Sequence, residues 1–311
     1  MSGRVTAVIA TCDRGAAVAR AVRSILANDP PVLELVVVDQ SSDDSTEVAL
    51  RPLAAETDLL RYRRLTQPGL SRARNDAIRG ATGEYVAITD DDCEVPPEWA
   101  GRVVEAFERD ERIAVVFGNV LPAPFDAAAG FIPGYVRDDI FLADDPAKKA
   151  GIDGIGACMA LRLSAWNALG GFDEMLGPGG AFPGGDEGDF AIRALAAGWY
   201  VLETPHLWVD HHGLRTLDQA YDCIGTYARG TGAMMAKHVR CRTPHARRLL
   251  GAMALRWSRG GIHQTAAMGD NRHRLRRLQA FATGFAEGTR APLDRSAVLF
   301  KPDNAQGRMH A

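Results

Sequence analysis

Short apolar runs alternate with helix-like segments along the first 120 residues of the chain. The run "RVTAVIA" (residues 4–10) predicts a strand, and Val18, Val22, Ile25 and Leu26 then follow at helical spacing. This alternation predicts a parallel sheet with helices on both faces. Further strands are predicted at residues 33–39, 59–65, 84–88 and 112–120, and further helices at residues 71–81, capped by Ser71, and 97–109, with Pro97 in the first turn.

The pattern is less regular in the second half. Residues 121–150 contain several prolines and acidic residues and predict a long surface excursion. A glycine-rich stretch at residues 176–185 leads into a predicted helix at residues 186–199, which Gly198 is expected to end. "WYVLETP" and "HLWVDHHG" (residues 199–213) predict the last strands of the core.

Composition places the chain among ordinary globular proteins. Its 311 residues are 46% hydrophobic and 24% charged, which is enough for one large domain or two small ones. Five widely spaced cysteines without a C-x-x-C pair argue against a disulfide framework and a structural zinc site. The first residues are too weakly apolar for a signal peptide, and no run is long enough to span a membrane. We therefore expect a cytoplasmic protein.

Charge is distributed unevenly, although the net charge is only −3. Residues 237–279 contain eleven Lys or Arg and one acid, Asp270. Basic amphipathic helices of this kind either lie on an anionic membrane surface or pack against the rest of the protein with their arginines in solvent. No recognised nucleic-acid-binding module accompanies the charge, so a nucleic-acid partner is not expected.

Acidic residues follow several of the predicted strands. Asp13 comes after the first strand, Asp39 ends the second, and Asp90, Asp91 and Asp92 follow the fourth. In an open parallel sheet, ligands bind beyond the carboxyl ends of the strands. A single acid there is usually a solvated turn residue. Three adjacent carboxylates repel one another unless a cation neutralises them, so this aspartate triplet favours a Mg²⁺ or Mn²⁺ site over an exposed acidic turn.

An ordered set of motifs resembles the inverting family 2 glycosyltransferases of the GT-A fold. It comprises "AVIATCDR", "LVVVDQSSDDST", "GLSRARNDAIRGATGEYVAITDDDCEVPPEW", "GACMALRLSAWNALGGFDE", "GGDEGDFAIRALAAGW" and "ETPHLWVDHHG", over about residues 4–213. The resemblance implies an α/β fold with a mixed, mostly parallel sheet flanked by helices. It also implies a catalytic domain at residues 1–213, with a nucleotide-binding half at about 1–120 and an acceptor and base half at about 150–213, followed by a basic helical extension at 214–311.

The resemblance further implies a nucleotide-diphosphate sugar donor and a divalent metal, Mn²⁺ or Mg²⁺. Asp39 would accept hydrogen bonds from the nucleotide base. Asp90 and Asp92 would hold the metal against the diphosphate, with His211 as a further ligand or as a structural histidine. Asp91 could replace one of the two aspartates, because a triplet permits two alignments. The residues expected to bind the nucleotide sugar are Thr11, Asp13, Arg14, Asp39, Arg74, Asp90 and Asp91.

The predicted catalytic residues are two acids at the start of a helix. The family usually has Glu-Asp there and uses the second acid as the catalytic base, whereas this chain has Asp186 followed by Glu187. The resemblance favours Glu187 only slightly over Asp186 as the base. Capping of the helix by Asp186 is the alternative for that residue.

The sequence leaves the acceptor open as a saccharide, a lipid-linked molecule or a small molecule. The resemblance favours a role in cell-envelope or polysaccharide biosynthesis, with contact to the inner face of the plasma membrane through the basic helices. Two other functions are weighed against it. A sugar-nucleotide nucleotidyltransferase would need a glycine-rich loop that "ATCDRGAA" does not supply. A non-catalytic nucleotide-sugar-binding protein would keep the fold without turnover.

Overall fold

The computed structural model describes residues 4–259 and 271–302. The strands are β1 (Val5–Thr11), β2 (Glu34–Asp39), β3 (Leu60–Arg64), β4 (Tyr85–Asp90), β5 (Cys93–Glu94), β6 (Ile113–Pro122), β7 (Phe141–Ala143), β8 (Cys158–Arg162), β9 (Tyr200–His211), β10 (Leu293–Asp294) and β11 (Leu299–Phe300). The helices are η1 (Gly15–Ala17), α1 (Val18–Leu26), α2 (Ser45–Glu56), α3 (Leu70–Arg79), α4 (Trp99–Phe107), η2 (Pro146–Gly151), α5 (Leu163–Leu169), α6 (Asp186–Ala196), α7 (Leu217–Arg240), α8 (Ala246–Arg259) and α9 (Asn271–Arg290).

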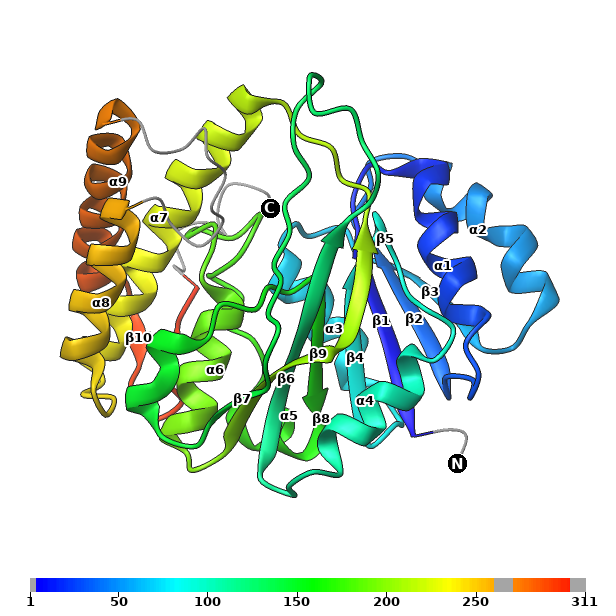
Figure 1. The fold of residues 1–311 in the computed structure, drawn as a ribbon, viewed down its shortest axis with the longest axis horizontal. Helices are drawn as coiled ribbons and strands as arrows, with labels where there is room; N and C mark the ends of the chain where they lie inside the picture. The colour runs from blue at the N-terminus through cyan, green and yellow to red at the C-terminus, as the bar shows by residue number, and fades with distance from the viewer. Residues whose placement is uncertain (1–3, 260–270, 303–311) are drawn as a thin grey trace.

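One mixed sheet forms the centre of the molecule, with helices on both faces (Figure 1). Its strand order is β3-β2-β1-β4-β8-β6-β9-β5, and β7 pairs with β9. The pairs β1–β2, β1–β4, β2–β3 and β6–β9 are parallel, whereas β8 runs antiparallel to both of its neighbours. The predicted α/β class, with a mixed and mostly parallel sheet, is confirmed.

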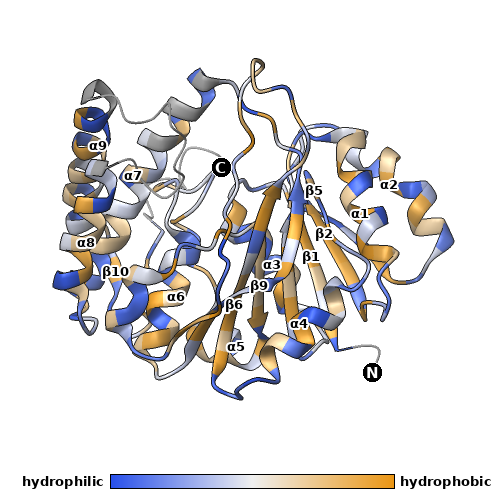
Figure 2. Cartoon of the chain, in the orientation of Figure 1, coloured by the Kyte–Doolittle hydropathy of each residue, from blue (hydrophilic) through white to orange (hydrophobic). Residues whose placement is uncertain are grey.

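The strands are apolar on both faces because helices cover both faces. β2 is buried along its whole length, and its valines divide between the two cores that flank the sheet. Figure 2 shows the strands as the most hydrophobic segments of the chain. Trp99 and Trp166, one in each core, are buried packing residues. Parallel strands covered in this way read as near-continuous apolar runs, which is why the pattern predicted them.

Some predicted helix starts were wrong. α3 begins at Leu70, so Ser71 lies inside the helix and donates its hydroxyl hydrogen to the carbonyl of Leu176 instead of capping. α4 begins at Trp99, two residues beyond Pro97. Gly198 behaves as predicted, because it follows α6 with a φ of +87°. The pattern did not predict α2, which contains Pro52 in its interior.

The segment from residue 121 to 150 is more than a surface excursion. β6 continues to Pro122, β7 adds a strand beside β9, and η2 buries Lys149 between α6 and α8. The prediction failed because the segment lacks periodicity and its partners are distant in sequence. It therefore builds part of the core and one wall of the site described below.

The C-terminal helices share a core with the rest of the chain. Buried residues of α7, α8 and α9 pack with Leu176, Phe182 and Ile192, which lie near and within α6. Figure 1 shows these helices side by side at the end of the molecule next to α6. The apolar side of the basic region is thus used in packing. No helix among the described residues is long and apolar enough to cross a membrane.

A buried ionic cluster joins α6 to α7. Asp189 accepts hydrogen bonds from Arg193 at 2.8 Å and from His238 at 2.9 Å, and its carboxylate lies 2.7 Å from the Lys237 ammonium. Lys237 also pairs with Asp173. Burial alone would raise the pKa of Asp189, but the lysine and arginine charges outweigh it and lower the pKa. The cluster fixes α6, whose first turn carries Asp186 and Glu187.

Candidate active site

The sheet brings the predicted acidic residues to one edge. Thr11, the last residue of β1, lies opposite Asp39 at the end of β2, and Ala10 lies opposite Asp90 at the end of β4. The short strand β5 then pairs with the end of β9, so that Cys93 lies opposite His211. The carboxyl ends of these strands therefore place the aspartate triplet beside His211, as the sequence predicted for ligand-binding edges.

A cavity of about 490 Å³ opens at this edge. It extends past the start of α6 to α8, and it is lined by the glycine-rich segment and by the residues after η2. Most of the predicted site residues line it, namely Thr11, Arg14, Arg74, Asp90, Asp91, Asp92, Asp186, Glu187 and His211. The sheet and α6 thus bring together residues that are up to 200 positions apart.

Asp13 and Asp39 lie next to the cavity but do not line it. Asp39 is fully buried and accepts hydrogen bonds from Ser41 and from the Tyr62 hydroxyl at 2.7 Å. Asp13 has a φ of +54° and accepts hydrogen bonds from the Ser42 backbone at 3.0 Å. Both aspartates therefore brace the loops after β1 and β2. Their predicted contact with a nucleotide stays a prediction.

The members of the aspartate triplet have different partners. Asp91 accepts the Thr11 hydroxyl at 2.7 Å and lies 3.4 Å from the Arg14 guanidinium. Burial raises the pKa of Asp91 to about 6 despite these contacts. Asp92 lies 3.2 Å from both Arg14 and His211, and together they outweigh its burial and lower its pKa. Arg14 thus supplies part of the cationic charge that three adjacent aspartates require.

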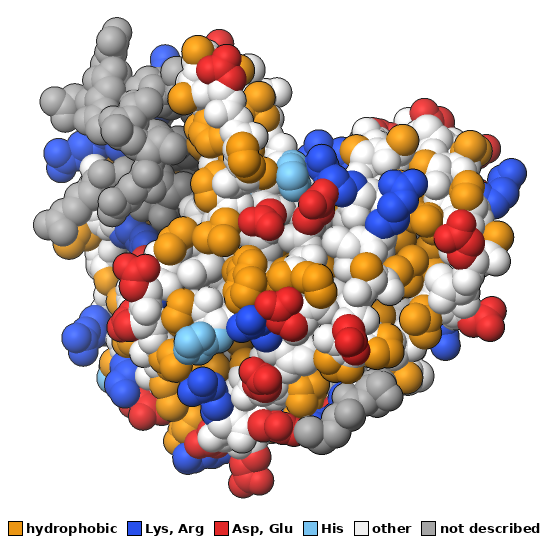
Figure 3. All heavy atoms as spheres, turned by 45° about the vertical axis from the view of Figure 1, so that its right-hand side comes forward, with side chains coloured by type: hydrophobic (Ala, Val, Ile, Leu, Met, Phe, Trp, Pro, Cys, Tyr) orange, Lys and Arg blue, Asp and Glu red, His pale blue; other side chains and the backbone are white. Residues whose placement is uncertain are grey.

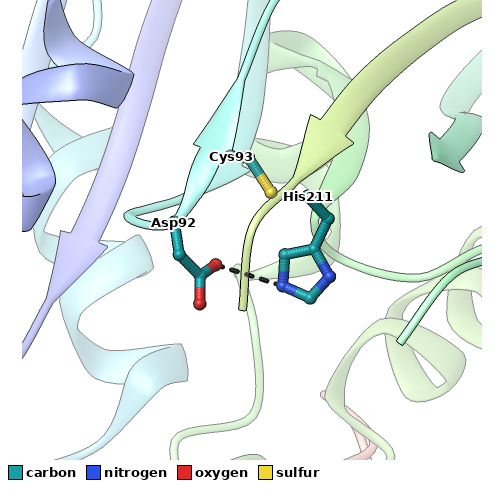
Figure 4. Close-up of side chains that lie close together, drawn as sticks. All are labelled: Asp92, Cys93 and His211. Carbon is teal, nitrogen blue, oxygen red and sulfur yellow. Dashed lines mark ion pairs between the residues drawn. The ribbon is translucent and has the colours of Figure 1, made fainter. Parts of the chain in front are cut away.

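His211 is held in one orientation. Its Nδ1 lies 2.7 Å from the carbonyl oxygen of Pro133, which can only accept, so Nδ1 carries a proton. Its Nε2 then faces the Asp92 carboxylate (Figure 4). A backbone carbonyl that fixes a histidine tautomer in this way is the usual outer partner of a metal-ligating imidazole. His211 Nε2 and the Asp92 carboxylate can therefore share a proton, or they can both bind a divalent cation.

The residues present fit a divalent metal. Ligand atoms of Asp92, Cys93 and His211 all lie within 4.8 Å of one another. Burial raises the pKa of the Cys93 thiol far above its usual range, so the sulfur stays protonated and is a poor ligand for Mn²⁺ or Mg²⁺. Gly213 leaves the necessary space, because a Cβ there would lie 2.5 Å from Asp92 Oδ2 and 2.7 Å from His211 Nε2.

Arg74 links the two acidic groups of the cavity. Its guanidinium is 1% exposed and donates to Asp186 at 3.0 Å and to Glu187 at 3.2 Å. It also lies 3.5 Å from Asp90, the member of the triplet nearest to it. Asp90 therefore has Arg74 as its cation, whereas Asp92 has His211. The predicted role of Asp90 as a metal ligand stays a prediction. The predicted role of Arg74 in nucleotide binding also stays a prediction.

The acids at the start of α6, Asp186 and Glu187, differ in protonation. Burial and the neighbouring Glu187 raise the pKa of Asp186 well above its usual range. Burial acts on Glu187 too, but the Arg74 charge outweighs it and lowers the Glu187 pKa. Glu187 is also the more accessible, with 24% of its side chain exposed. The lowered pKa favours an ionised carboxylate at Glu187, which lines the cavity, and the raised pKa of Asp186 makes it the member of the pair that takes up a proton more readily.

Two glycines allow the close packing around this pair. A Cβ on Gly156 would lie 2.2 Å from Glu187 Oε1 and 2.6 Å from Arg74, and one on Gly154 would lie 2.2 Å from Phe117. Both belong to the run "GIDGIG" at residues 151–156. Glycines outside a turn signal indicate close backbone approach, and here they mark the cavity wall.

Sequence reasoning missed several further cavity residues. They come from segments that are distant in the chain and that carry no motif, and long-range packing alone assembles them. These residues are Lys149, Asp153, Arg215, Tyr227, Met253, Arg256 and Trp257.

Comparison with known proteins gives a family and a fold. The model described as Glycosyl transferase family 2 matches residues 6–162. The chain is 30% identical to the succinoglycan biosynthesis protein ExoM of Rhizobium meliloti over 199 residues, which cover 61% of each protein. It is 28% identical to a GalNAc(5)-diNAcBac-PP-undecaprenol beta-1,3-glucosyltransferase of Campylobacter jejuni over 120 residues, or 38% of each. The chain thus spans less than two thirds of both relatives.

A solved structure has the same fold. It is the mannosyltransferase PcManGT from Pyrobaculum calidifontis in complex with GDP-Man and Mn²⁺. The match has a TM-score of 0.61 at 21% identity and covers 94% of this chain and 77% of that one. The likeness extends over the sheet and the C-terminal helices, and it confirms the expected GT-A type fold.

Proposed function

The chain belongs to glycosyl transferase family 2, a family of glycosyltransferase enzymes, and we propose that it moves a sugar from a nucleotide-diphosphate donor to an acceptor hydroxyl with inversion. One observation carries this proposal. A single cavity is bounded by the metal-competent pair Asp92–His211 and by the carboxylate of Glu187, and Arg74 lies between Glu187 and Asp90 of the aspartate triplet. An inverting transfer needs a cation that neutralises the leaving diphosphate and a base that deprotonates the acceptor, both within reach of the same substrates.

The donor end of the cavity lies at the carboxyl ends of β1 and β4. Asp92 and His211 would hold Mn²⁺ or Mg²⁺, with Asp90 or Asp91 as further ligand. The metal, when bound, supplies positive charge for the diphosphate. Thr11 and Arg14 lie beside it, and Arg14, which is half exposed and pairs with Asp91 and Asp92, adds positive charge there. The GDP-Man and Mn²⁺ in the solved mannosyltransferase support a donor and metal of this class.

Glu187 is the proposed catalytic base. It takes the proton from the acceptor hydroxyl, and the oxygen forms a bond to the anomeric carbon. The bond from that carbon to the diphosphate oxygen breaks, and its electron pair leaves with the nucleoside diphosphate. Attack on the face opposite the leaving group inverts the configuration. Asp186 keeps its proton, binds Arg74 and positions Glu187.

The relatives support a role in cell-surface polysaccharide biosynthesis. ExoM is named for succinoglycan, and the Campylobacter protein for an undecaprenol-linked acceptor. We place the enzyme in the cytoplasm, at the inner face of the membrane. The exposed arginines of the C-terminal extension, Arg247, Arg248, Arg274 and Arg276, would provide that contact.

Release of nucleoside diphosphate tests the proposed function. A panel of nucleotide-diphosphate sugars should be incubated with the full chain in Mn²⁺ and in chelator. We expect at least one donor to bind and to release its diphosphate slowly to water, with release lost in chelator and restored by Mn²⁺ or Mg²⁺. Absence of binding by every donor in either metal would contradict the proposal.

A further inference from the structure

Lys149 is a buried cation that forms no ion pair with any carboxylate among the described residues. It is 5% exposed, and its ammonium makes one long hydrogen bond, 3.4 Å, to the carbonyl of Ile152. Within residues 4–259 and 271–302 no carboxylate forms an ion pair with it. Lys148, its neighbour, is instead exposed and paired with Asp144 at 2.6 Å. A buried ammonium that lacks an anion is costly, so its retention in a cavity wall points to a ligand.

The surroundings of Lys149 offer hydrogen-bond donors rather than acceptors. Trp257 is 2% exposed, and its indole Nε1 has no hydrogen-bond partner among the described residues. Arg256 pairs with Asp153 through one nitrogen, while its buried Nε has no hydrogen-bond partner in the same part of the chain. These side chains line the same cavity as Lys149. The group includes two cations and one anion, Asp153. Two further carboxylates act on Lys149, but Glu203 is paired with Arg137 and Glu187 with Arg74, so a net positive charge is left for a ligand to neutralise.

This donor group lies on the acceptor side of the carboxylate pair. η2, which carries Lys149, packs against both α6 and α8. Figure 1 shows α6 between α8 and the sheet. A donor sugar held at the triplet would reach Glu187 from one side. A molecule that presents its hydroxyl to Glu187 from the other side therefore extends toward Lys149 and Trp257.

We propose that the cavity end formed by Lys149, Arg256 and Trp257 binds an anionic oxygen group, a carboxylate or a phosphate, of the acceptor. The inference rests on the proposed function and adds the class of acceptor to it. The Lys149 ammonium neutralises the anion, and the indole N–H donates to one of its oxygens. Met253 and Ile152, which line the same end, would contact the apolar face of the acceptor.

Calorimetric titration with three probes tests the proposal: neutral glucose, glucuronate and glucose 6-phosphate. In the wild-type chain we expect one or both anionic probes to bind at least about tenfold tighter than glucose, and the two anionic probes separate a carboxylate from a phosphate. Lys149→Met should remove this preference. Lys148→Met is the matched control and should keep it. Lys149→Gln repeats the test if the methionine variant does not fold.

Several outcomes would overturn the proposal. Equal binding of the three probes, or no binding of any, would show that this end does not select anions. A preference that survives in Lys149→Met would place the anion elsewhere. Titration of the same proteins with nucleoside diphosphates and Mn²⁺ keeps the two proposals apart. If the wild-type chain does not bind nucleoside diphosphate with Mn²⁺, the proposed function is contradicted. Lys149→Met should leave this binding unchanged.

Discussion

At the scale of single residues, the site places a basic side chain beside each of its buried acids. Arg74 balances Asp90 and Glu187, Arg14 balances Asp91, and His211 balances Asp92. These partners shift the pKa values in different directions. The pKa of Asp186 is raised and the pKa of Glu187 is lowered, although the two are neighbours in sequence.

Glu187→Gln is expected to lower kcat by about 10²–10⁴, because a positioned general base contributes about that much. Donor affinity should change little, since the amide keeps the shape of the side chain. Asp186→Asn should cost less, because that group is already protonated. The measurement is steady-state transfer together with calorimetric donor binding. A large loss in Asp186→Asn with near-normal activity in Glu187→Gln would identify Asp186 as the base instead.

Lys149 should make stability depend on pH. Burial lowers its pKa to about 8, while the charges of Asp153, Glu203 and Glu187 oppose this and Arg256 adds to it. The unfolded chain therefore binds one more proton than the folded chain between about pH 8 and 10.5. Stability should rise with pH across that window, by up to roughly 3 kcal/mol relative to Lys149→Met. Urea unfolding of both proteins, in buffers without phosphate or carboxylate, measures the difference. Parallel pH profiles would contradict the lowered pKa.

At the scale of elements, short segments next to the strands set the positions of the proposed metal ligands. The strand β5 is only two residues long, yet its pairing with β9 sets Asp92 against His211. Gly213, two residues beyond β9, keeps the space between them open. On the other side, the contacts of α6 with α7 hold the carboxylate pair in place.

Gly213→Ala should weaken metal-dependent binding of a nucleoside diphosphate by at least about tenfold, because the new methyl group occupies the place of the cation. Its backbone does not have a positive φ, so the fold should persist. Gly251→Ala in α8 is the matched control, since a Cβ there meets nothing within 4 Å. That variant should bind normally and gain up to about 1 kcal/mol of stability. Normal binding in Gly213→Ala would place the metal elsewhere.

Asp189→Asn should lower the free energy of unfolding by about 3–5 kcal/mol, because it leaves buried cations without a full counter-charge. Denaturant unfolding measures the loss. Asp144→Asn, which removes an exposed partner of Lys148, is the control and should cost less than about 1 kcal/mol. Similar values for the two variants would mean that the α6–α7 cluster contributes no more than a surface pair.

At the scale of the whole molecule, the catalytic half and the C-terminal helices enclose one cavity. Buried residues of α7, α8 and α9 share a core with Leu176 and Ile192, and Arg256 reaches the cavity from α8. The division into residues 1–213 and 214–311 therefore stays a proposal about sequence regions, since the two pack against each other. Figure 3 shows acidic and basic side chains interspersed on one face of the molecule, consistent with a small net charge.

The sequence predicted the parts of the site that follow from local pattern. Apolar runs that end in Thr11 and Asp90 marked the sheet edge, because parallel strands place their carboxyl ends together. Contacts between segments that are distant in the chain could not be predicted from the sequence. Arg74 meets Asp186 across 112 residues, and Lys149 lies in a segment without periodicity. Side chains of this kind are placed by tertiary packing, which no local spacing encodes.

The most direct test of the account is calorimetric titration of a nucleoside diphosphate, with and without Mn²⁺, into the wild-type chain and Asp92→Ala. The account claims that Asp92 and His211, with a further aspartate of the triplet, hold a divalent cation that also binds the diphosphate. It predicts Mn²⁺-dependent binding in the wild-type chain and a loss of at least about tenfold in the folded variant. Equal affinity in the two proteins, or equal affinity with and without Mn²⁺, would contradict it.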